Sequence, residues 1–336
     1  MTVDVRIAVE SAARLSETPH GLTAAVAAHA KDAYRSCFNN WDRTATVRRS
    51  PSRFLGDVAP HELYFPPELA PAFAHPLVAG RGEDVQRRFL VQTLYQYLNF
   101  TSELEDVAVI PAAMDLSRNQ SGLDLAVNAR QDAYKIVTDE AWHAQFSHDL
   151  YRQIAEATGE SAPLARPPLF VERLNAVREH LIAGLAAVGQ LLFAIVSETL
   201  VSSLLAKIPH DTRLPRGVRD TVADHAVDEG RHHAYFHKVL QYLWASLTHG
   251  ERCRVGPWVP AVILAFLEPD YRAVANSLAS LGLSAEEIEQ VIVDVYPRER
   301  LLLSAAAAAR PTIRYFTELG ALRDPATSDA FAVLAR

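Results

Sequence analysis

The segment ADHAVDEGRH at residues 223–232 decides the fold. Within it, His225, Glu229 and His232 follow one another at intervals of four and three, so on an α-helix their side chains lie on one face. A shorter version of the pattern, DEAWH at residues 139–143, occurs earlier in the chain. A carboxylate and an imidazole one helical turn apart can bind the same ion, so the two copies predict a protein that holds two metals.

Long helices surround both motifs. Apolar residues that recur every three or four positions predict four of them, over residues 83–116, 122–157, 170–207 and 216–247. The first places Glu105 on its buried face, and the third carries Glu198 in an almost wholly apolar stretch. The order is therefore Glu, Glu-x-x-His, then again Glu, Glu-x-x-His, which is the ligand order of di-metal carboxylate bundles. We predict an all-α protein, a ferritin-like four-helix bundle with additional N- and C-terminal helices.

The rest of the chain is expected to join this bundle in a single helical domain, residues 1–336. Residues 1–80 would form an N-terminal wrap, with a helical piece at 21–37 followed by a proline-rich segment that cannot be continuous helix. Residues 81–248 would form the di-metal core, in which Pro111 kinks or ends the first helix and the proline-containing segment 161–168 is the crossover. Residues 249–336 would add further helices, notably at 260–281, 285–296 and 301–310.

Composition excludes several functions. A net charge of −7 with scattered basic residues argues against nucleic acid and against an anionic membrane surface as partners. The apolar run 181–201 contains Gln190 and Glu198, which favours a buried helix over a membrane span. Cys37 and Cys253 are too few for a disulfide framework and receive no role; with no secretory signal at the N-terminus, they favour a cytoplasmic location.

A single Glu-x-x-His is weak evidence, because roughly one match is expected by chance at this composition. The chain contains such a match at residues 17–20, which we reject because it includes a proline and has no apolar stripe. The other two lie on amphipathic helices, and each Glu follows an aspartate, Asp139 or Asp228, placed to accept a hydrogen bond from a ligand histidine. Carboxylates and imidazoles without thiolate favour iron or manganese.

His225 adds a third histidine to this set. Together with the two Asp-Glu-x-x-His motifs and the Glu198-Thr199 pair, it makes the chain resemble the AurF-like di-iron N-oxygenases, the family of p-aminobenzoate N-oxygenase, over roughly residues 87–236. His233 is off the stripe and is expected at the surface or supporting a ligand. The resemblance implies these metal ligands: Glu105, Glu140, His143, Glu198, His225, Glu229 and His232.

The resemblance also implies a chemistry. Two iron ions per chain, cycling between Fe2+ and Fe3+, would use O2 to oxidise a primary amine nitrogen to a hydroxylamine, nitroso or nitro group in secondary metabolism. Manganese is an expected substitute. Residues 80–82, Gly-Arg-Gly, lack the third glycine and the preceding strand of a dinucleotide fingerprint, so electrons are expected from a separate reductase or ferredoxin. The resemblance further implies a homodimer.

The substrate stays open between an arylamine and an aliphatic amine or amino acid. Tyr97, Phe100 and Thr101 lie within two turns of Glu105 and are candidates for its pocket, although aromatic residues at this spacing are more often core. The alternatives are another di-iron oxidase, such as a C–H hydroxylase or desaturase, and a non-enzymatic ferritin-like iron-binding protein. The third histidine argues against the first, and the long terminal segments argue against the second.

Overall fold

The computed structural model describes residues 34–162, 164, 167–181, 185–200 and 205–334. These residues form helices and connecting loops, with no strand among them, which confirms the all-α prediction. None of their helices is both long and apolar enough to cross a membrane. The α-helices are α3 Trp41–Thr44, α4 Thr46–Arg49, α5 Pro76–Ala79, α6 Glu83–Leu104, α7 Ile110–Ser117, α8 Val127–Thr158, α9 Leu169–His180, α10 Ala186–Leu200, α12 Arg216–Ser246, α13 His249–Val255, α14 Val259–Leu267, α15 Tyr271–Ser280, α16 Ala285–Val295, α17 Arg298–Ala308, α18 Arg310–Glu318 and α19 Pro325–Phe331.

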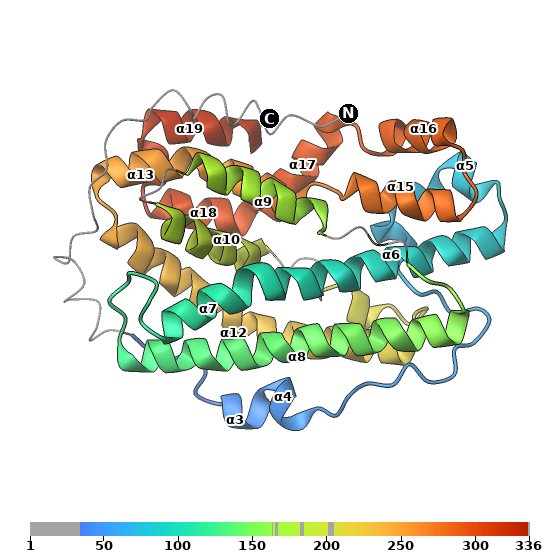
Figure 1. Ribbon diagram of the computed structural model, residues 1–336, viewed down its shortest axis with the longest axis horizontal. Helices are drawn as coiled ribbons and strands as arrows, with labels where there is room; N and C mark the ends of the chain where they lie inside the picture. Colours follow the sequence, from blue (N-terminus) through green and yellow to red (C-terminus); the bar gives the residue numbers. More distant parts are fainter. Residues whose placement is uncertain (1–33, 163, 165–166, 182–184, 201–204, 335–336) are drawn as a thin grey trace.

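Four of these elements form the core bundle: α6 continued by α7, then α8, α10 and α12. Helices α6 and α7 pack along α8, and α10 packs on α12. Figure 1 shows α3 and α4 below this bundle and α13 to α19 above it. The predicted four-helix core with additional helices on both sides of it in the sequence is confirmed. Short 3₁₀ helices complete the structure, at Pro67–Leu69, Pro71–Ala74, Ile208–His210, Gly256–Trp258, Ala321–Arg323 and Ala332–Leu334.

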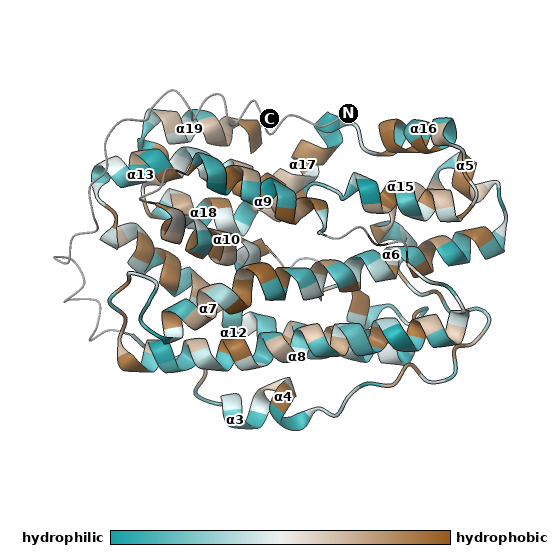
Figure 2. Cartoon of the chain, viewed as in Figure 1, coloured by the Kyte–Doolittle hydropathy of each residue, from teal (hydrophilic) through white to brown (hydrophobic). Residues whose placement is uncertain are grey.

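The bundle buries apolar side chains in two clusters with a polar layer between them. In Figure 2 teal and brown residues alternate along α6, α8 and α12, as expected for helices with one buried and one exposed side. One cluster includes Leu104 and Ile136, and the other includes Leu98 and Leu150. On α8 and α12 the glutamates and histidines of the motifs fall between these two clusters in sequence, so these helices place the polar layer at mid-bundle.

The first predicted helix is continuous but contains an irregular turn. A π-helical segment, Glu105–Val109, joins α6 to α7, and Pro111 does not end the helix because it is the second residue of α7. A proline at this position lacks the N–H that would donate to a carbonyl in the preceding turn. The side-chain amide of Gln190 on α10 donates to two carbonyl oxygens of that turn, those of Val107 at 3.3 Å and Ala108 at 3.4 Å.

The prediction of one helix over residues 170–207 is wrong. The helix stops after α9, where Leu181 has an extended backbone, and a separate helix, α10, carries Glu198. Distant contacts hold α9: Arg173 donates to the carbonyl oxygens of Glu268 at 2.7 Å and Pro269 at 2.8 Å. Helix α9 therefore packs against α14, while the apolar α10 enters the core.

Two further predictions need correction. The predicted helix 260–281 is divided into α14 and α15, because Pro269 follows the extended Glu268 and cannot continue a helix. The predicted helical piece at 21–37 lies mostly outside the described residues, and residues 34–37 of it are not helical. The proposed crossover at 161–168 is also described only in part. The predictions for 122–157, 216–247, 285–296 and 301–310 are confirmed as α8, α12, α16 and α17.

The N-terminal strap, residues 38–58, runs along α8 and α12. Gln153 on α8 accepts a hydrogen bond from the backbone N–H of Leu55 at 2.7 Å and donates to the carbonyl of Arg53 at 3.0 Å. On the other side the strap touches Gly217 of α12, where an added Cβ would lie 2.7 Å from the Leu55 Cα. The absence of a side chain at Gly217 is therefore what lets the strap approach α12.

Replacing Gly217 with alanine should push the strap away and lower the free energy of unfolding by about 1–3 kcal/mol, the usual cost of overpacking. Chemical denaturation measures the loss, and limited proteolysis should show faster cleavage within the strap. The matched control is Gly230→Ala on the same helix, where a Cβ has open space. That change should be neutral or stabilise by about 0.5–1 kcal/mol because alanine favours helix. Equal effects of the two substitutions would contradict the close approach.

Candidate metal centre

All seven predicted ligands lie together in the polar layer of the bundle. Glu105 comes from the first residue of the π-helical segment, two ligands come from α8, one from α10 and three from α12. None is more than 4% exposed. The spacing on α12 acts as predicted: His225, Glu229 and His232 face the layer from successive turns of one helix. The seven are Glu105, Glu140, His143, Glu198, His225, Glu229 and His232.

The donor atoms form overlapping groups. Within each of three groups, one atom from every member lies within 4.8 Å of the others. The Nδ1 of His143 is 2.7 Å from Glu140 Oε2, and the Nε2 of His225 is 3.0 Å from Glu229 Oε1. A residue that belongs to two groups can contact two neighbouring cations, so the overlap suits a pair of ions better than a single ion. The groups are Glu105, His143, His225 and Glu229; Glu140, His143, Glu229 and His232; and Glu105, Glu140 and Glu198.

Several of these donor atoms have no hydrogen-bond partner within the described part of the chain. They are buried oxygens of all four glutamates and the Nδ1 of His232. His232 Nδ1 and Glu140 Oε1 are 2.8 Å apart but are not aligned for a hydrogen bond. A buried charged atom without a partner is costly, and a cation between such atoms removes that cost. The residues present therefore fit a metal pair, and oxygen and imidazole donors without thiolate fit iron or manganese.

The electrostatics of the layer point the same way. Burial, and then the neighbouring carboxylates, raise the pKa of Glu105 and Glu198 well above the ordinary value. Burial alone would lower the pKa of His232, but Glu140 and Asp139 beside it raise that pKa well above its ordinary value. A raised pKa means that each of these three groups holds its proton more tightly than usual. Metal ions would take the place of those protons.

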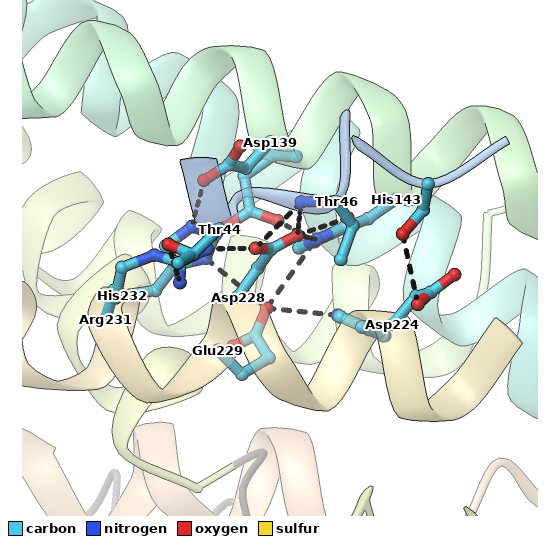
Figure 3. A network of polar contacts seen from close by, with 12 residues as sticks. Thr44, Thr46, Asp139, His143, Asp224, Asp228, Glu229, Arg231 and His232 are labelled. Carbon is cyan, nitrogen blue, oxygen red and sulfur yellow. Dashed lines mark hydrogen bonds and ion pairs between the residues drawn. The ribbon is translucent and has the colours of Figure 1, made fainter. Parts of the chain in front are cut away.

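Asp139 and Asp228 bind the far nitrogens of the histidines, each across the bundle (Figure 3). Asp139 on α8 is 3.2 Å from Nε2 of His232 on α12, and Asp228 on α12 is 3.2 Å from Nε2 of His143 on α8. Each aspartate thus orients the histidine of the opposite helix, and both are fully buried. The sequence predicted the two aspartates as partners of ligand histidines, but it did not predict this exchange between helices.

The strap and its surroundings supply donors to both aspartates, and these residues were missed. The indole N–H of Trp41 lies 2.9 Å from both oxygens of Asp139. Thr46 donates to Asp228 from its backbone N–H at 3.3 Å and from its hydroxyl, and Arg231 also donates to Asp228. Figure 3 shows Thr46 and Arg231 converging on Asp228. Of these donors, only Arg231 could have been predicted from the sequence, because it follows Asp228 by three residues on the same helix.

Helix α18 helps to position the centre from the other side. Thr312 on α18 donates to the hydroxyl of Thr199, the residue after Glu198, at 2.8 Å. His233 is half-buried, with its Nε2 2.7 Å from the hydroxyl of Tyr315 on α18. His233 therefore supports the packing of α12 on α18 and does not point into the donor groups.

The three predicted pocket residues have different environments. Tyr97 has a buried hydroxyl without a hydrogen-bond partner among the described residues, and burial followed by the nearby Glu229 raises its pKa. Thr101 is buried, while the Phe100 ring packs at a tilt of 59° against Phe170 with ring centroids 4.8 Å apart, as a core residue does. Tyr97 is the best placed of the three.

A cavity of about 200 Å³ opens between α6 and α8. Ser102 and Ser147, both buried, lie on its wall, one helical turn from Glu105 and from His143 respectively. Among the residues that the structure describes, its lining contains no lysine or arginine. The lining residues are Leu98, Asn99, Ser102, Ser147, His148, Tyr151, Ala162 and Leu164.

A four-helix bundle that buries overlapping glutamate and histidine groups at its centre belongs to the class of ferritin-like di-metal carboxylate proteins. Within this class, the chain belongs to the family described as P-aminobenzoate N-oxygenase AurF, whose model matches residues 49–320. Membership confirms the resemblance seen in the sequence and implies an oxygenase built on a helical di-iron fold. No curated protein matches the chain.

Metal uptake should stabilise the protein and release protons. Anaerobic titration of the metal-free protein with Fe2+ should load two ions per chain and raise Tm, because the ions bind only the folded donor groups. A pH-indicator dye should report proton release. Since protons compete for raised-pKa Glu105, Glu198 and His232, apparent affinity should fall as pH is lowered.

Glu198→Ala tests whether these ions bind at the donor groups. It removes from α10 one carboxylate that has an oxygen without a hydrogen-bond partner, and it leaves all the histidines in place. It should lower the iron content per chain and reduce the Tm gain. Uptake of two ions by this variant with unchanged affinity would show that the binding site lies elsewhere.

Proposed function

We propose that the protein is a non-haem di-iron monooxygenase that uses O2 to oxidise the nitrogen of a primary amine, giving a hydroxylamine and, on further turnover, nitroso or nitro products. The observation that carries the proposal is the third histidine, His225, inside the donor groups of a chain whose family is that of p-aminobenzoate N-oxygenase. Nitrogen donors beyond the two Glu-x-x-His motifs are a reason to expect chemistry different from that of oxidases acting on carbon.

The seven clustered glutamates and histidines would hold the iron, and bound iron would supply the reduction of O2. The chain supplies the surroundings. The layer is closed to bulk solvent: His143, Glu140 and His232 have no exposed surface. Exclusion of water strengthens each electrostatic interaction there and limits unproductive side reactions.

Tyr97 is the residue we propose for orienting the amine. Its raised pKa keeps the hydroxyl protonated at neutral pH, and the hydroxyl has no partner within the described residues. It can therefore donate to, or accept from, a substrate bound beside Glu105. We further propose that the cavity between α6 and α8 is the approach for the substrate, since its serines lie one turn from two of the ligands.

The chemistry of the cavity wall bears on the substrate class. The described part of the cavity wall has no lysine or arginine, so it offers no permanently charged ion-pair partner for a carboxylate. Such a wall suits a primary amine, aromatic or aliphatic, whose other groups carry no charge. The nitrogen must present its lone pair, so the unprotonated amine is the reactive form.

The proposal is tested by product analysis. The iron-loaded, reduced protein should be mixed with O2 and either p-aminobenzoate or a neutral primary amine, and hydroxylamine, nitroso and nitro products measured by mass spectrometry with ¹⁸O2. Incorporation of ¹⁸O on nitrogen is expected. Oxygen appearing on carbon, or iron mineral with no oxidised amine, would replace the proposal with one of its competitors.

His225→Ala should separate metal binding from oxygenation. Six of the seven ligands remain, so iron should still bind, while N-oxygenation should be lost because a nitrogen donor is missing. The control is His210→Ala, an exposed histidine outside the bundle core. Native turnover in the His225→Ala protein would remove the third histidine from the mechanism.

A further inference from the structure

A continuous line of contacts leads from the strap to the donor groups. The Trp41 ring is 8% exposed, and its N–H is 2.9 Å from the carboxylate of Asp139. Asp139 is in turn 3.2 Å from Nε2 of His232, whose Nδ1 faces Glu140. The line therefore joins a nearly buried aromatic ring just below the surface to a ligand histidine through two hydrogen-bonded contacts.

The surface above Trp41 is basic, although the protein as a whole is acidic. Residues 34–53 contain five arginines and a single acidic residue, Asp42, in a chain of net charge −7. Arg43, Arg48 and Arg49 are exposed. The Arg48 guanidinium lies over the Trp41 ring, 5.4 Å from its centroid. Its ion pair with Asp42 is long, 3.9 Å, and exposed, so it neutralises little of this charge.

We infer that the exposed arginines of α3 and α4 form the docking site for an acidic one-electron carrier protein, and that electrons enter the centre through Trp41, Asp139 and His232. The inference rests on the proposed function, which requires an external reductant. An acidic carrier would be repelled by most of this acidic protein and attracted to this one face, and such steering raises association rates. Redox partners typically form small contacts of this kind.

The oxidation of one amine by one O2 requires two electrons from the carrier. Each encounter oxidises the carrier, an iron–sulfur or flavin protein, by one electron and reduces one Fe3+ to Fe2+. Two encounters supply the two electrons that, with two protons, convert one O2 and one primary amine into the hydroxylamine and one water. No nucleotide is consumed by this chain itself, in keeping with the absence of a dinucleotide fingerprint from its sequence.

The equivalent contact on the other histidine provides an internal control. Thr46 and Arg231 bind Asp228, which binds His143, in the same arrangement but without an aromatic ring. Thr46→Val removes the hydroxyl and keeps the shape, so it disturbs a histidine partner without touching the proposed route. Trp41→Phe removes the indole N–H and keeps an aromatic ring in the strap.

Docking is tested on the metal-free protein with a plant-type [2Fe–2S] ferredoxin as the probe. Calorimetry at low salt should show binding that weakens as salt is raised. Arg43→Glu with Arg49→Glu should weaken it by about tenfold or more. Arg298→Glu with Arg300→Glu, on α17 at the opposite side of the bundle in Figure 1, should not. Absence of binding, or equal effects of both pairs, would overturn the docking site.

The route is tested on the iron-loaded protein without any amine, by following loss of ferric absorption in a stopped-flow instrument. With reduced ferredoxin, Trp41→Phe should slow reduction several-fold more than Thr46→Val does, at equal iron content and Tm. With reduced methyl viologen, a small cation, the Trp41→Phe protein should react as fast as the unsubstituted protein. An unchanged rate for Trp41→Phe with ferredoxin would overturn the route. Because no amine is used, failure of N-oxygenation would leave these results standing.

Discussion

The structure depends on keeping four glutamates and three histidines in one dry layer. Four buried carboxylates repel one another, and burial alone disfavours their charged forms. The bundle keeps them because each helix contributes its members on one face, and because the imidazoles lie between the carboxylates, as His143 does between Glu140 and Glu229. Apolar clusters on both sides of the layer supply the hydrophobic burial that holds the helices together despite this repulsion.

The exchange between Asp139 and Asp228 extends this constraint outward. Each buried aspartate needs donors of its own, since a histidine supplies only one hydrogen bond. The strap provides most of them, with an indole for Asp139 and a hydroxyl and a backbone amide for Asp228, and Arg231 of α12 adds a guanidinium for Asp228. The N-terminal segment is thus part of the centre in energetic terms, although it contributes none of the clustered donor residues.

Sequence periodicity was sufficient for three of the four core helices and for bringing the candidate ligands together, because these follow from local helical geometry. Helix α12 begins where predicted and ends within one residue of the prediction. What the sequence could not give depends on distant contacts. Arg173 of α9 binds carbonyls of the segment between α14 and α15, and Trp41 meets Asp139 across 98 positions. No spacing encodes such pairs. The π-helical turn at Glu105 was also missed, because nothing in its composition differs from ordinary helix.

The two halves of the bundle echo each other, and the difference between them is specific. In α12 the position one turn before Glu229 is His225; in α8 the equivalent position before Glu140 is Ile136, which is fully buried in an apolar cluster. At this position α12 therefore has a nitrogen donor, whereas α8 has an apolar core residue. The first half differs in another way, since its lone glutamate, Glu105, begins a π-helical turn whereas Glu198 lies in regular helix. A symmetric pair of motifs thus holds an asymmetric donor set, with the extra imidazole reaching toward Glu105, 3.9 Å from its carboxylate. The extra imidazole of His225 and the π-helical turn at Glu105 therefore lie at the same end of the centre. This end is next to α6, the helix that carries Tyr97 and lines the cavity.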